Sequence, residues 1–219
     1  MVVVVELTPG AVVVLVDESD QAEGGSRDQG SGDSGVTLSE IYELSPGPSS
    51  SALTNVSNGR FVAKKDVGGG FTQWNYHVGY PINSYDVSLN IGAYEHFADK
   101  TGTTTLDFYA LPEDLDKAKA QFAQAKPMIE AFKHYFGEYP FDRDGYKLID
   151  VPYTGMEHQS AVTYGNGFKN GYGGRDWTGV CVSPKFDFII IHESGHEWFG
   201  NAVSAADVAD MWIQEGFCT

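Results

Sequence analysis

The sequence is short of cysteine and of basic residues. Its two cysteines, Cys181 and Cys218, are too few for a disulfide framework and lack zinc-ligand spacing. We expect both to be small, buried, apolar side chains. The 14 lysines and arginines are outnumbered by 30 aspartates and glutamates, which gives a net charge of −16. This charge argues against nucleic acid and anionic membrane surfaces as partners, because both repel an acidic protein.

Long hydrophobic runs are also absent. Residues 1–16 are rich in valine, but Glu6 and Pro9-Gly10 interrupt them. No run approaches the roughly twenty apolar residues of a membrane span, so we predict none. The same stretch predicts two short strands joined at residues 8–10. No clear signal peptide is recognisable, which leaves cytoplasmic and exported locations both open.

Residues 17–51 have few large apolar side chains outside 36–44 and are rich in glycine, serine and aspartate. Such a composition buries too little surface to offset the entropy of ordering. We therefore predict that residues 1–51 form a poorly ordered or divergent segment. The whole chain is 42% hydrophobic and 13% aromatic, which suits a globular protein with a substantial core.

Short strands are predicted in the next part of the chain, up to residue 98. Asn58-Gly59 is a strong two-residue hairpin signal, and the glycine run at 68–70 predicts a second turn. Residues 85–89 alternate as in a half-buried strand. The strands are expected at residues 52–56, 61–65, 71–78 and 85–89.

A strand at residues 101–110 is followed by a helix that Pro112 opens. Apolar residues then recur at steps of three and four, which predicts one buried helical stripe. The stripe consists of Leu115, Ala118, Phe122, Ala125, Ile129, Phe132 and Phe136. Pro127 falls inside the helix and should kink or interrupt it, and Gly137 and Pro140 should end it.

The strongest functional signal is His192-Glu193-Ser194-Gly195-His196. Two histidines at i and i+4 lie one turn apart on one face of a helix, where both can reach a single metal ion. The glutamate after the first histidine is then placed to act on a metal-activated water. Residues 186–191 favour a strand locally, but we predict a helix because the histidine spacing requires one and packing can override propensity.

A zinc site that hydrolyses peptides needs a third protein ligand and an open fourth position. Glu215 is a candidate, with eighteen residues between it and His196. Ser204 with Asp207 has the spacing of a capping box, which predicts a helix start at Ser204. Along that helix Val208, Trp212 and Glu215 would share one face, which could turn the carboxylate toward the histidines.

The flanks of this motif, Trp198-Phe199-Gly200-Asn201 and residues 212–217, resemble the gluzincin family of zinc aminopeptidases that includes alanyl aminopeptidase and the leukotriene hydrolase. The family pattern is His-Glu-x-x-His, eighteen residues, then Glu, and this chain matches it without a gap. The resemblance covers residues 52–219. It implies an α+β fold, with the end of a β-rich amino-terminal domain at residues 52–100 and the first half of a thermolysin-like catalytic domain at residues 101–219.

A second constellation lies at Gly155-Met156-Glu157. The family has Gly-x-Met-Glu-Asn at this point, on an exposed edge strand beside the zinc, and its glutamate binds the free α-amino group of the substrate. Thr154 stands where the first glycine is usual, and His158 where the asparagine is usual. A carboxylate fixed near the metal would pair with an ammonium group and exclude substrates whose amine is blocked. An edge strand would also hold a peptide by backbone hydrogen bonds.

The resemblance thus implies a zinc-dependent aminopeptidase that acts on peptides with a free amino terminus. One Zn²⁺ would be held by His192, His196 and Glu215. Glu193 would serve as the general base and then as the acid, and Glu157, with Met156 and Gly155, would bind the substrate. The tyrosine that stabilises the oxyanion in the family has no counterpart here, so we expect a truncated and weakly active or inactive fragment.

Three alternatives stay open. A zinc endopeptidase would share the ligands but tolerate blocked amino termini, and Glu157 argues against it. Epoxide hydrolysis occurs on the same site in one branch of the family, and nothing in the sequence selects it. A non-catalytic zinc-binding module is expected to lose Glu193 or a ligand, and all four residues are present.

Overall fold

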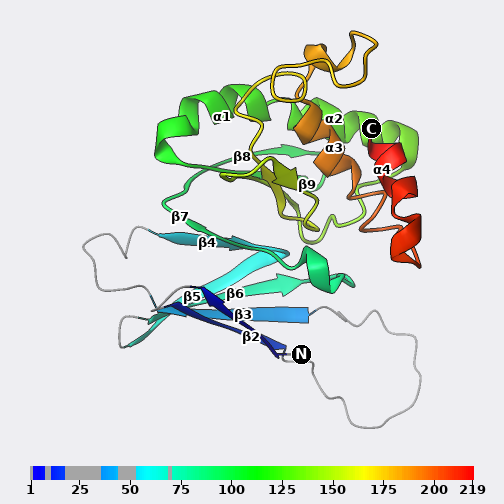
Figure 1. The fold of residues 1–219 in the computed structure, drawn as a ribbon. Helices are drawn as coiled ribbons and strands as arrows, with labels where there is room; N and C mark the ends of the chain where they lie inside the picture. The colour runs from blue at the N-terminus through cyan, green and yellow to red at the C-terminus, as the bar shows by residue number, and fades with distance from the viewer. Residues whose placement is uncertain (1, 8–10, 18–35, 44–52, 69–70) are drawn as a thin grey trace.

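The computed structural model describes residues 2–7, 11–17, 36–43, 53–68 and 71–219. These residues form two five-stranded sheets and a two-stranded pair, together with the helices that Figure 1 shows covering one of the sheets. The α+β fold expected from the sequence is confirmed. No helix in this described part is both long and apolar enough to span a membrane.

The amino-terminal sheet has the strand order β1-β2-β3-β6-β5 and is antiparallel throughout. Its strands are β1 Val2–Leu7, β2 Ala11–Asp17, β3 Val36–Glu43, β5 Arg60–Gly68 and β6 Phe71–Val78. The two strands predicted within residues 1–16 are confirmed, while their turn at residues 8–10 lies outside the described residues.

Part of the segment predicted to be poorly ordered or divergent also belongs to this sheet. Strand β3 pairs with β2 on one side and with β6 on the other, so the sheet extends across the boundary expected at residue 51. Residues 18–35 and 44–52 lie outside the described residues. For them the expectation stays a prediction.

The Asn58-Gly59 hairpin prediction is wrong. Strand β4 (Thr54–Ser57) pairs with β7 (Leu89–Gly92) in the two-stranded pair, whereas β5 pairs with β6. Asn58 and Gly59 therefore carry the chain from one sheet to another. Residues 84–86 form a short 3-10 turn ahead of β7, so the strand expected at residues 85–89 begins four residues late.

The second sheet has the order β11-β12-β10-β9-β8. Its strands are β8 Glu95–Thr101, β9 Thr104–Ala110, β10 Tyr146–Asp150, β11 Gly155–Met156 and β12 Val162–Tyr164. The three inner strands are parallel, and the two edge strands run antiparallel to their neighbours. Because β8 joins this sheet, the domain boundary expected between residues 100 and 101 falls inside the β8–β9 hairpin, and the division of the chain into domains stays a prediction.

Four α-helices complete the described part of the chain. They are α1 Leu115–Phe122, α2 Ala125–Phe136, α3 Phe188–Gly195 and α4 Trp212–Cys218. The predicted interruption near Pro127 is confirmed, although the break lies just before it, and α2 ends at Gly137 with a positive φ of 99°. The stripe is buried at its centre, but Phe136 is 49% exposed, so its assignment to the core is wrong.

A buried apolar core lies between the second sheet and α1, α2 and α3. Phe122 and Ile129 enter it from the first two helices, Tyr146 and Leu148 from β10, and Ile190 from α3. The core thus fixes α3 against a rigid sheet.

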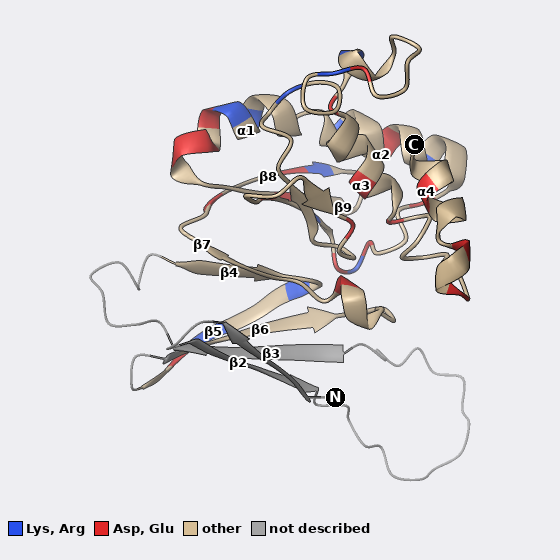
Figure 2. Cartoon of the chain, in the orientation of Figure 1, with Lys and Arg blue, Asp and Glu red and all other residues tan. Residues whose placement is uncertain are grey.

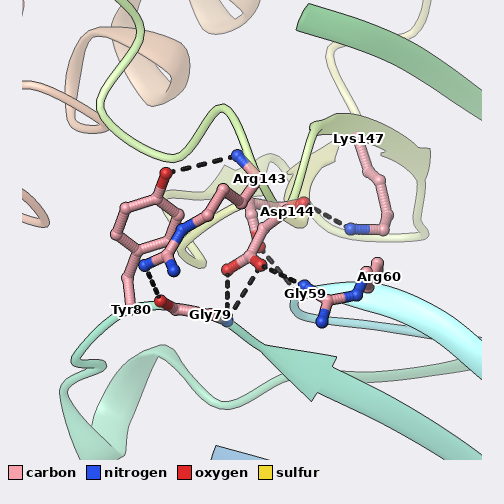
Figure 3. A network of polar contacts seen from close by, with 8 residues as sticks. Gly59, Arg60, Gly79, Tyr80, Arg143, Asp144 and Lys147 are labelled. Carbon is pink, nitrogen blue, oxygen red and sulfur yellow. Dashed lines mark hydrogen bonds and ion pairs between the residues drawn. The ribbon is translucent and has the colours of Figure 1, made fainter. Parts of the chain in front are cut away.

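Buried polar contacts join the amino-terminal sheet to the second sheet (Figure 3). The Asp144 carboxylate accepts two hydrogen bonds from the Gly79 N–H, at 2.9 and 3.0 Å, and lies 4.0 Å from Arg60 Nη1. The Arg143 guanidinium donates to the Gly79 carbonyl and lies 4.3 Å from the centre of the Tyr80 ring. Burial raises the pKa of Asp144. The buried Asp144 carboxylate is thus hydrogen-bonded at this junction.

Candidate metal centre

Helix α3 carries the histidine motif and is a short helix with weak intrinsic stability. It is eight residues long and contains three isoleucines. Asp187 caps it, because its carboxylate accepts from the N–H groups of Ile189 and Ile190 at 3.1 and 3.4 Å. The helix predicted over the local strand preference is confirmed, with His196 as the residue that follows its last turn.

The Asp187 carboxylate is shared with other elements. It also accepts from Tyr164 Oη on β12 at 2.6 Å, from Gln121 Nε2 on α1 at 2.7 Å and from Asn166 Nδ2 at 2.8 Å. Asp187 is fully buried. The start of the metal helix is therefore fixed to α1 and to the second sheet by one side chain.

The structure brings the three predicted ligands together. His192 Nε2 lies 3.4 Å and His196 Nε2 lies 3.5 Å from the same oxygen, Glu215 Oε2. The two imidazole rings are 4.9 Å apart and nearly perpendicular, at 87°. Three donor atoms of these types surrounding one point match the nitrogen and oxygen ligand set of a zinc site.

Hydrogen bonds to backbone carbonyls fix the tautomer of both rings. His192 Nδ1 lies 3.2 Å from the Cys218 carbonyl, and His196 Nδ1 lies 2.9 Å from the Phe199 carbonyl. A carbonyl oxygen can only accept, so each Nδ1 carries the proton and each Nε2 presents its lone pair. Such partners orient ligating histidines in metal sites.

His196 Nε2 provides the test of whether a metal fits. This atom is buried and has no hydrogen-bond partner among the described residues. A buried polar atom without a partner is costly, about 1–3 kcal/mol. A cation between Nε2 and Glu215 would satisfy it, so the residues present fit a bound zinc ion.

Helix α4 brings in Glu215, but not in the predicted way. Asp207, not Ser204, is the capping residue: its carboxylate accepts from the Ala209 N–H at 2.9 Å and starts a 3-10 turn. Ser204 Oγ instead donates to the Gly200 carbonyl at 2.6 Å. Trp212 is 70% exposed, so the face expected to turn inward lies outward.

Two glycines allow α4 to approach the motif closely. A Cβ on Gly195 would lie 3.1 Å from Cys218 Sγ. A Cβ on Gly200 would lie 3.2 Å from Gln214 Nε2 and 3.3 Å from His196 Nδ1, and Gly200 also has a φ of +132°. Because neither glycine has a side chain, the backbone at these two points can lie close to α4, and Glu215 reaches the histidines.

Glu193 lies beside the ligands and is 7% exposed. Burial, followed by the neighbouring charges of Glu157 and Glu215, raises the pKa of Glu193 to about 8. This value applies to the protein without metal, and a bound divalent cation would favour the ionised carboxylate. A carboxylate with an elevated proton affinity is suited to proton transfer near neutral pH.

Glu157 follows the edge strand β11 and faces the same point. It is 7% exposed, and its carboxylate lies within 4.8 Å of ligand atoms of His196 and Glu215. A Cβ on Gly155 would lie 2.8 Å from Ile189 Cγ2 and 3.1 Å from Glu193 Cγ. The edge strand thus packs directly on α3, which places Glu157 next to His196 and Glu215.

The local charge around the site is of one sign. Every charged side chain of residues 186–219 other than histidine is acidic, and Figure 2 shows no lysine or arginine on α3 or α4. These acids are Asp187, Glu193, Glu197, Asp207, Asp210 and Glu215. Such a field attracts metal cations and ligands that carry an ammonium group.

Sequence reasoning missed Glu197 and Ser160. Glu197 is fully buried, and its carboxylate accepts from Tyr139 Oη at 2.9 Å and from the Ser160 N–H at 2.8 Å. Burial raises the pKa of Glu197 to about 8. The available signal was an acid directly after His196, ahead of the apolar Trp198-Phe199. An acidic residue that leads into an apolar pair is a candidate for a buried, hydrogen-bonded carboxylate.

The sequence comparison finds a family match over part of the chain. Residues 120–219 match the Peptidase family M1 domain. This match covers just under half of the chain, at its carboxy-terminal end. Probable aminopeptidase 2 from Sulfurisphaera tokodaii is 28% identical over 142 residues, which cover 63% of this chain and 18% of that protein. Endoplasmic reticulum aminopeptidase 1 from Mus musculus is 24% identical over 165 residues, which cover 74% of this chain and 18% of that protein.

Solved structures show the same fold. An M1 zinc metallopeptidase from Deinococcus radiodurans bound to a Tyr-Ser-Ala substrate has a TM-score of 0.54 at 20% identity, covering 76% of this chain and 36% of that one. A two-domain M1 zinc metallopeptidase bound to L-arginine has a TM-score of 0.57 at 19% identity, covering 83% of this chain and 38% of that one. The chain spans about one fifth of the length of these curated relatives.

Lys147 gives a pH-dependent prediction for the stability of this fold. It is 4% exposed on β10, and burial lowers its pKa from 10.5 to about 8. The unfolded chain therefore binds more protons than the folded chain between these values, and the stability contributed by this residue rises with pH there. Relative to Lys147→Met, the free energy of unfolding of the wild type should rise by up to about 3 kcal/mol between pH 8 and pH 10.5.

Urea denaturation of both proteins at pH 7.5 and pH 10 measures this difference. The Met variant keeps a side chain of similar length but has no titrating group, so it cancels the other groups that titrate in this range. A difference that stays constant between the two pH values would show that the Lys147 amine keeps its ordinary pKa.

Proposed function

We propose that this chain carries the zinc site and the amine-binding edge of an aminopeptidase that hydrolyses the amino-terminal peptide bond of peptides. One observation carries the proposal: the Nε2 atoms of His192 and His196 lie 3.4 and 3.5 Å from Glu215 Oε2, and the buried carboxylate of Glu157 lies at the same point. The M1 family and the named aminopeptidases support the reaction class.

One zinc ion would be held by His192, His196 and Glu215, and it would supply Lewis acidity toward a water molecule and the scissile carbonyl. Glu193 accepts the proton of the attacking water and returns it to the leaving amine, since its carboxylate lies beside the ligands in a buried position. The carbonyls of Cys218 and Phe199 keep both imidazoles oriented throughout.

Glu157 would bind the α-ammonium group of the substrate. A buried carboxylate next to the reacting bond pairs strongly with an ammonium group and rejects a neutral acetylated amine, because that group leaves the charge unpaired. Binding the first residue in this way places the first peptide bond, and no later one, at Glu193. An endopeptidase would not benefit from this carboxylate.

Zinc content per chain tests the ligand set. We expect close to one zinc per chain in the wild type. In His196→Ala the affinity for the metal should fall by at least about tenfold, because one of the three protein ligands is removed. His134→Ala is the matched control, since His134 is exposed on α2 far along the chain from the motif. No zinc in the wild type, or full zinc in His196→Ala, would contradict the proposed site.

Acidification should also release the metal. Burial lowers the pKa of His192, so the ring is neutral and ready to bind at pH 7. Protonation of His192, which begins below the ordinary histidine pKa of about 6.5, competes with the metal. Elemental analysis after dialysis at pH 7.5 and pH 4.5 measures this, and zinc fully retained at pH 4.5 would argue against histidine ligation.

A further inference from the structure

The loop that follows Glu157 is held at almost every residue. The Glu157 carbonyl accepts from Asn201 Nδ2 at 2.7 Å, and the Gln159 carbonyl accepts from Asn58 Nδ2 at 2.6 Å. The Ala161 N–H donates to the His158 carbonyl at 2.9 Å and closes a tight turn. These partners come from distant parts of the chain, so the turn is shaped by tertiary contacts.

Ser160 is the centre of this arrangement. Its φ is +57°, a left-handed conformation that is unfavourable for a residue other than glycine, and it is fully buried. Its N–H donates to Glu197 Oε1 at 2.8 Å, its carbonyl accepts from Lys147 Nζ at 3.0 Å, and its Oγ accepts from the Gly59 N–H at 2.8 Å. Three separate elements thus hold one strained residue, three positions after Glu157.

Glu197 connects this loop to the metal helix. It is the residue next to His196, and its second oxygen accepts from Tyr139 Oη at 2.9 Å. The carboxylate is therefore fixed on both oxygens, one toward the core and one toward the loop. Asn201, four residues further, holds the Glu157 carbonyl from the same turn. The chain that leaves His196 therefore contacts the Glu157 loop at two points.

The third support comes from the amino-terminal part of the chain. Gly59 has a φ of +72°, and a Cβ there would lie 2.2 Å from the His77 carbonyl oxygen, so only glycine fits. This turn presents its N–H to Ser160 across 101 residues of sequence. Figure 3 shows Gly59 and Lys147 in the same network as Asp144.

We propose that Ser160 and Glu197 are positioning residues that hold the Glu157 carboxylate where it binds the α-ammonium group of a substrate. The proposal rests on the proposed function, because it gives these residues a role in selecting free amines. A left-handed backbone costs a serine free energy, so this conformation persists only where surrounding contacts hold the residue in place. The loop held in this way begins directly after Glu157, and the hydrogen bond from the Ser160 N–H to Glu197 joins it to the residue after His196.

The test compares two probes on the zinc-loaded protein: alanine hydroxamate, with a free amine, and N-acetylalanine hydroxamate. Both present the same zinc-binding group, so the ratio of their dissociation constants by calorimetry isolates recognition of the amine. In the wild type the free amine should bind at least about tenfold more tightly, as expected for one charge-assisted hydrogen bond. In Glu197→Ala the ratio should fall to within about twofold of one, while the acetylated probe binds as before.

Glu197→Gln should keep the ratio within about threefold of the wild type, because an amide oxygen still accepts from the Ser160 N–H. Lys147→Met is a second variant, away from the motif, that removes the donor to the Ser160 carbonyl and should also lower the ratio. Ser183→Ala is the matched control: it truncates a fully buried residue whose Oγ bonds stay within residues 176–183.

The outcomes separate the two proposals. A ratio of the two dissociation constants near one in the wild type, with both probes bound, would contradict recognition of the amine by Glu157. It would overturn this inference as well. A normal ratio in both Glu197→Ala and Lys147→Met would overturn only the positioning role. Equal weakening of both probes in these variants would also overturn it, because it would show general support of the fold or of the metal.

Discussion

Replacing Glu157 by glutamine is expected to lower kcat/KM for a free aminoacyl substrate by about 10- to 100-fold, as for a lost charge-assisted hydrogen bond. The same change should leave an acetylated substrate unaffected, because that substrate has no ammonium group to bind. The isosteric amide keeps the packing of a residue that is only 7% exposed. The activities of the wild type and of Glu157→Gln toward a free and an acetylated p-nitroanilide of the same amino acid measure both effects.

Glu95→Gln is the matched control for this experiment. Glu95 undergoes the same chemical change on β8, where it is exposed. Its kinetics should match those of the wild type for both substrates. Discrimination that persists in Glu157→Gln would remove Glu157 from amine recognition and would favour a zinc endopeptidase that ignores the amino terminus.

Replacing Glu193 by glutamine is expected to lower kcat by about 10²- to 10⁴-fold, which is the usual contribution of a general base. The zinc content should stay at the wild-type value, since the ligands proposed for the metal are His192, His196 and Glu215. The amide occupies the same buried space but cannot accept the proton of the attacking water. Parallel measurement of kcat and of zinc per chain separates this chemical loss from a loss of metal.

Two results would contradict the role given to Glu193. Unchanged kcat with zinc bound would show that another group takes the proton. Loss of zinc together with kcat would show that Glu193 supports the metal site. The elevated pKa of this carboxyl in the protein without metal, about 8, is consistent with its burial and with the nearby Glu157 and Glu215.

The sequence predicted the parts of the site that depend on local spacing. The i, i+4 spacing predicted that His192 and His196 lie on one side of a helix, and the separation of eighteen residues made Glu215 a candidate third ligand, which the family resemblance then supported. Glu157 was predicted through the family resemblance. The strand that ends at Ala110 and the helical stretch that α1 and α2 form followed from apolar patterning and from glycine and proline.

The predictions that failed depend on partners far along the chain. Asn58-Gly59 makes a turn, as its residues indicate, but the strands beside it pair with others, because Asn58 donates to Gln159 and Gly59 to Ser160. Phe136 keeps the helical spacing of the apolar stripe, but it lies beyond the end of the core and is exposed. Ser160 has no local signal for its left-handed backbone, which arises from contacts with Glu197, Lys147 and Gly59.

The shared carboxylate of Asp187 has a consequence for the order in which the site assembles. Helix α3 is too short to persist alone, and its first turn depends on a side chain that is also bonded to α1 and β12. The histidines can therefore converge only after those elements have docked. We expect the amide protons of α3 to exchange with solvent only through global unfolding, and metal uptake by the refolding chain to follow the rate of core formation.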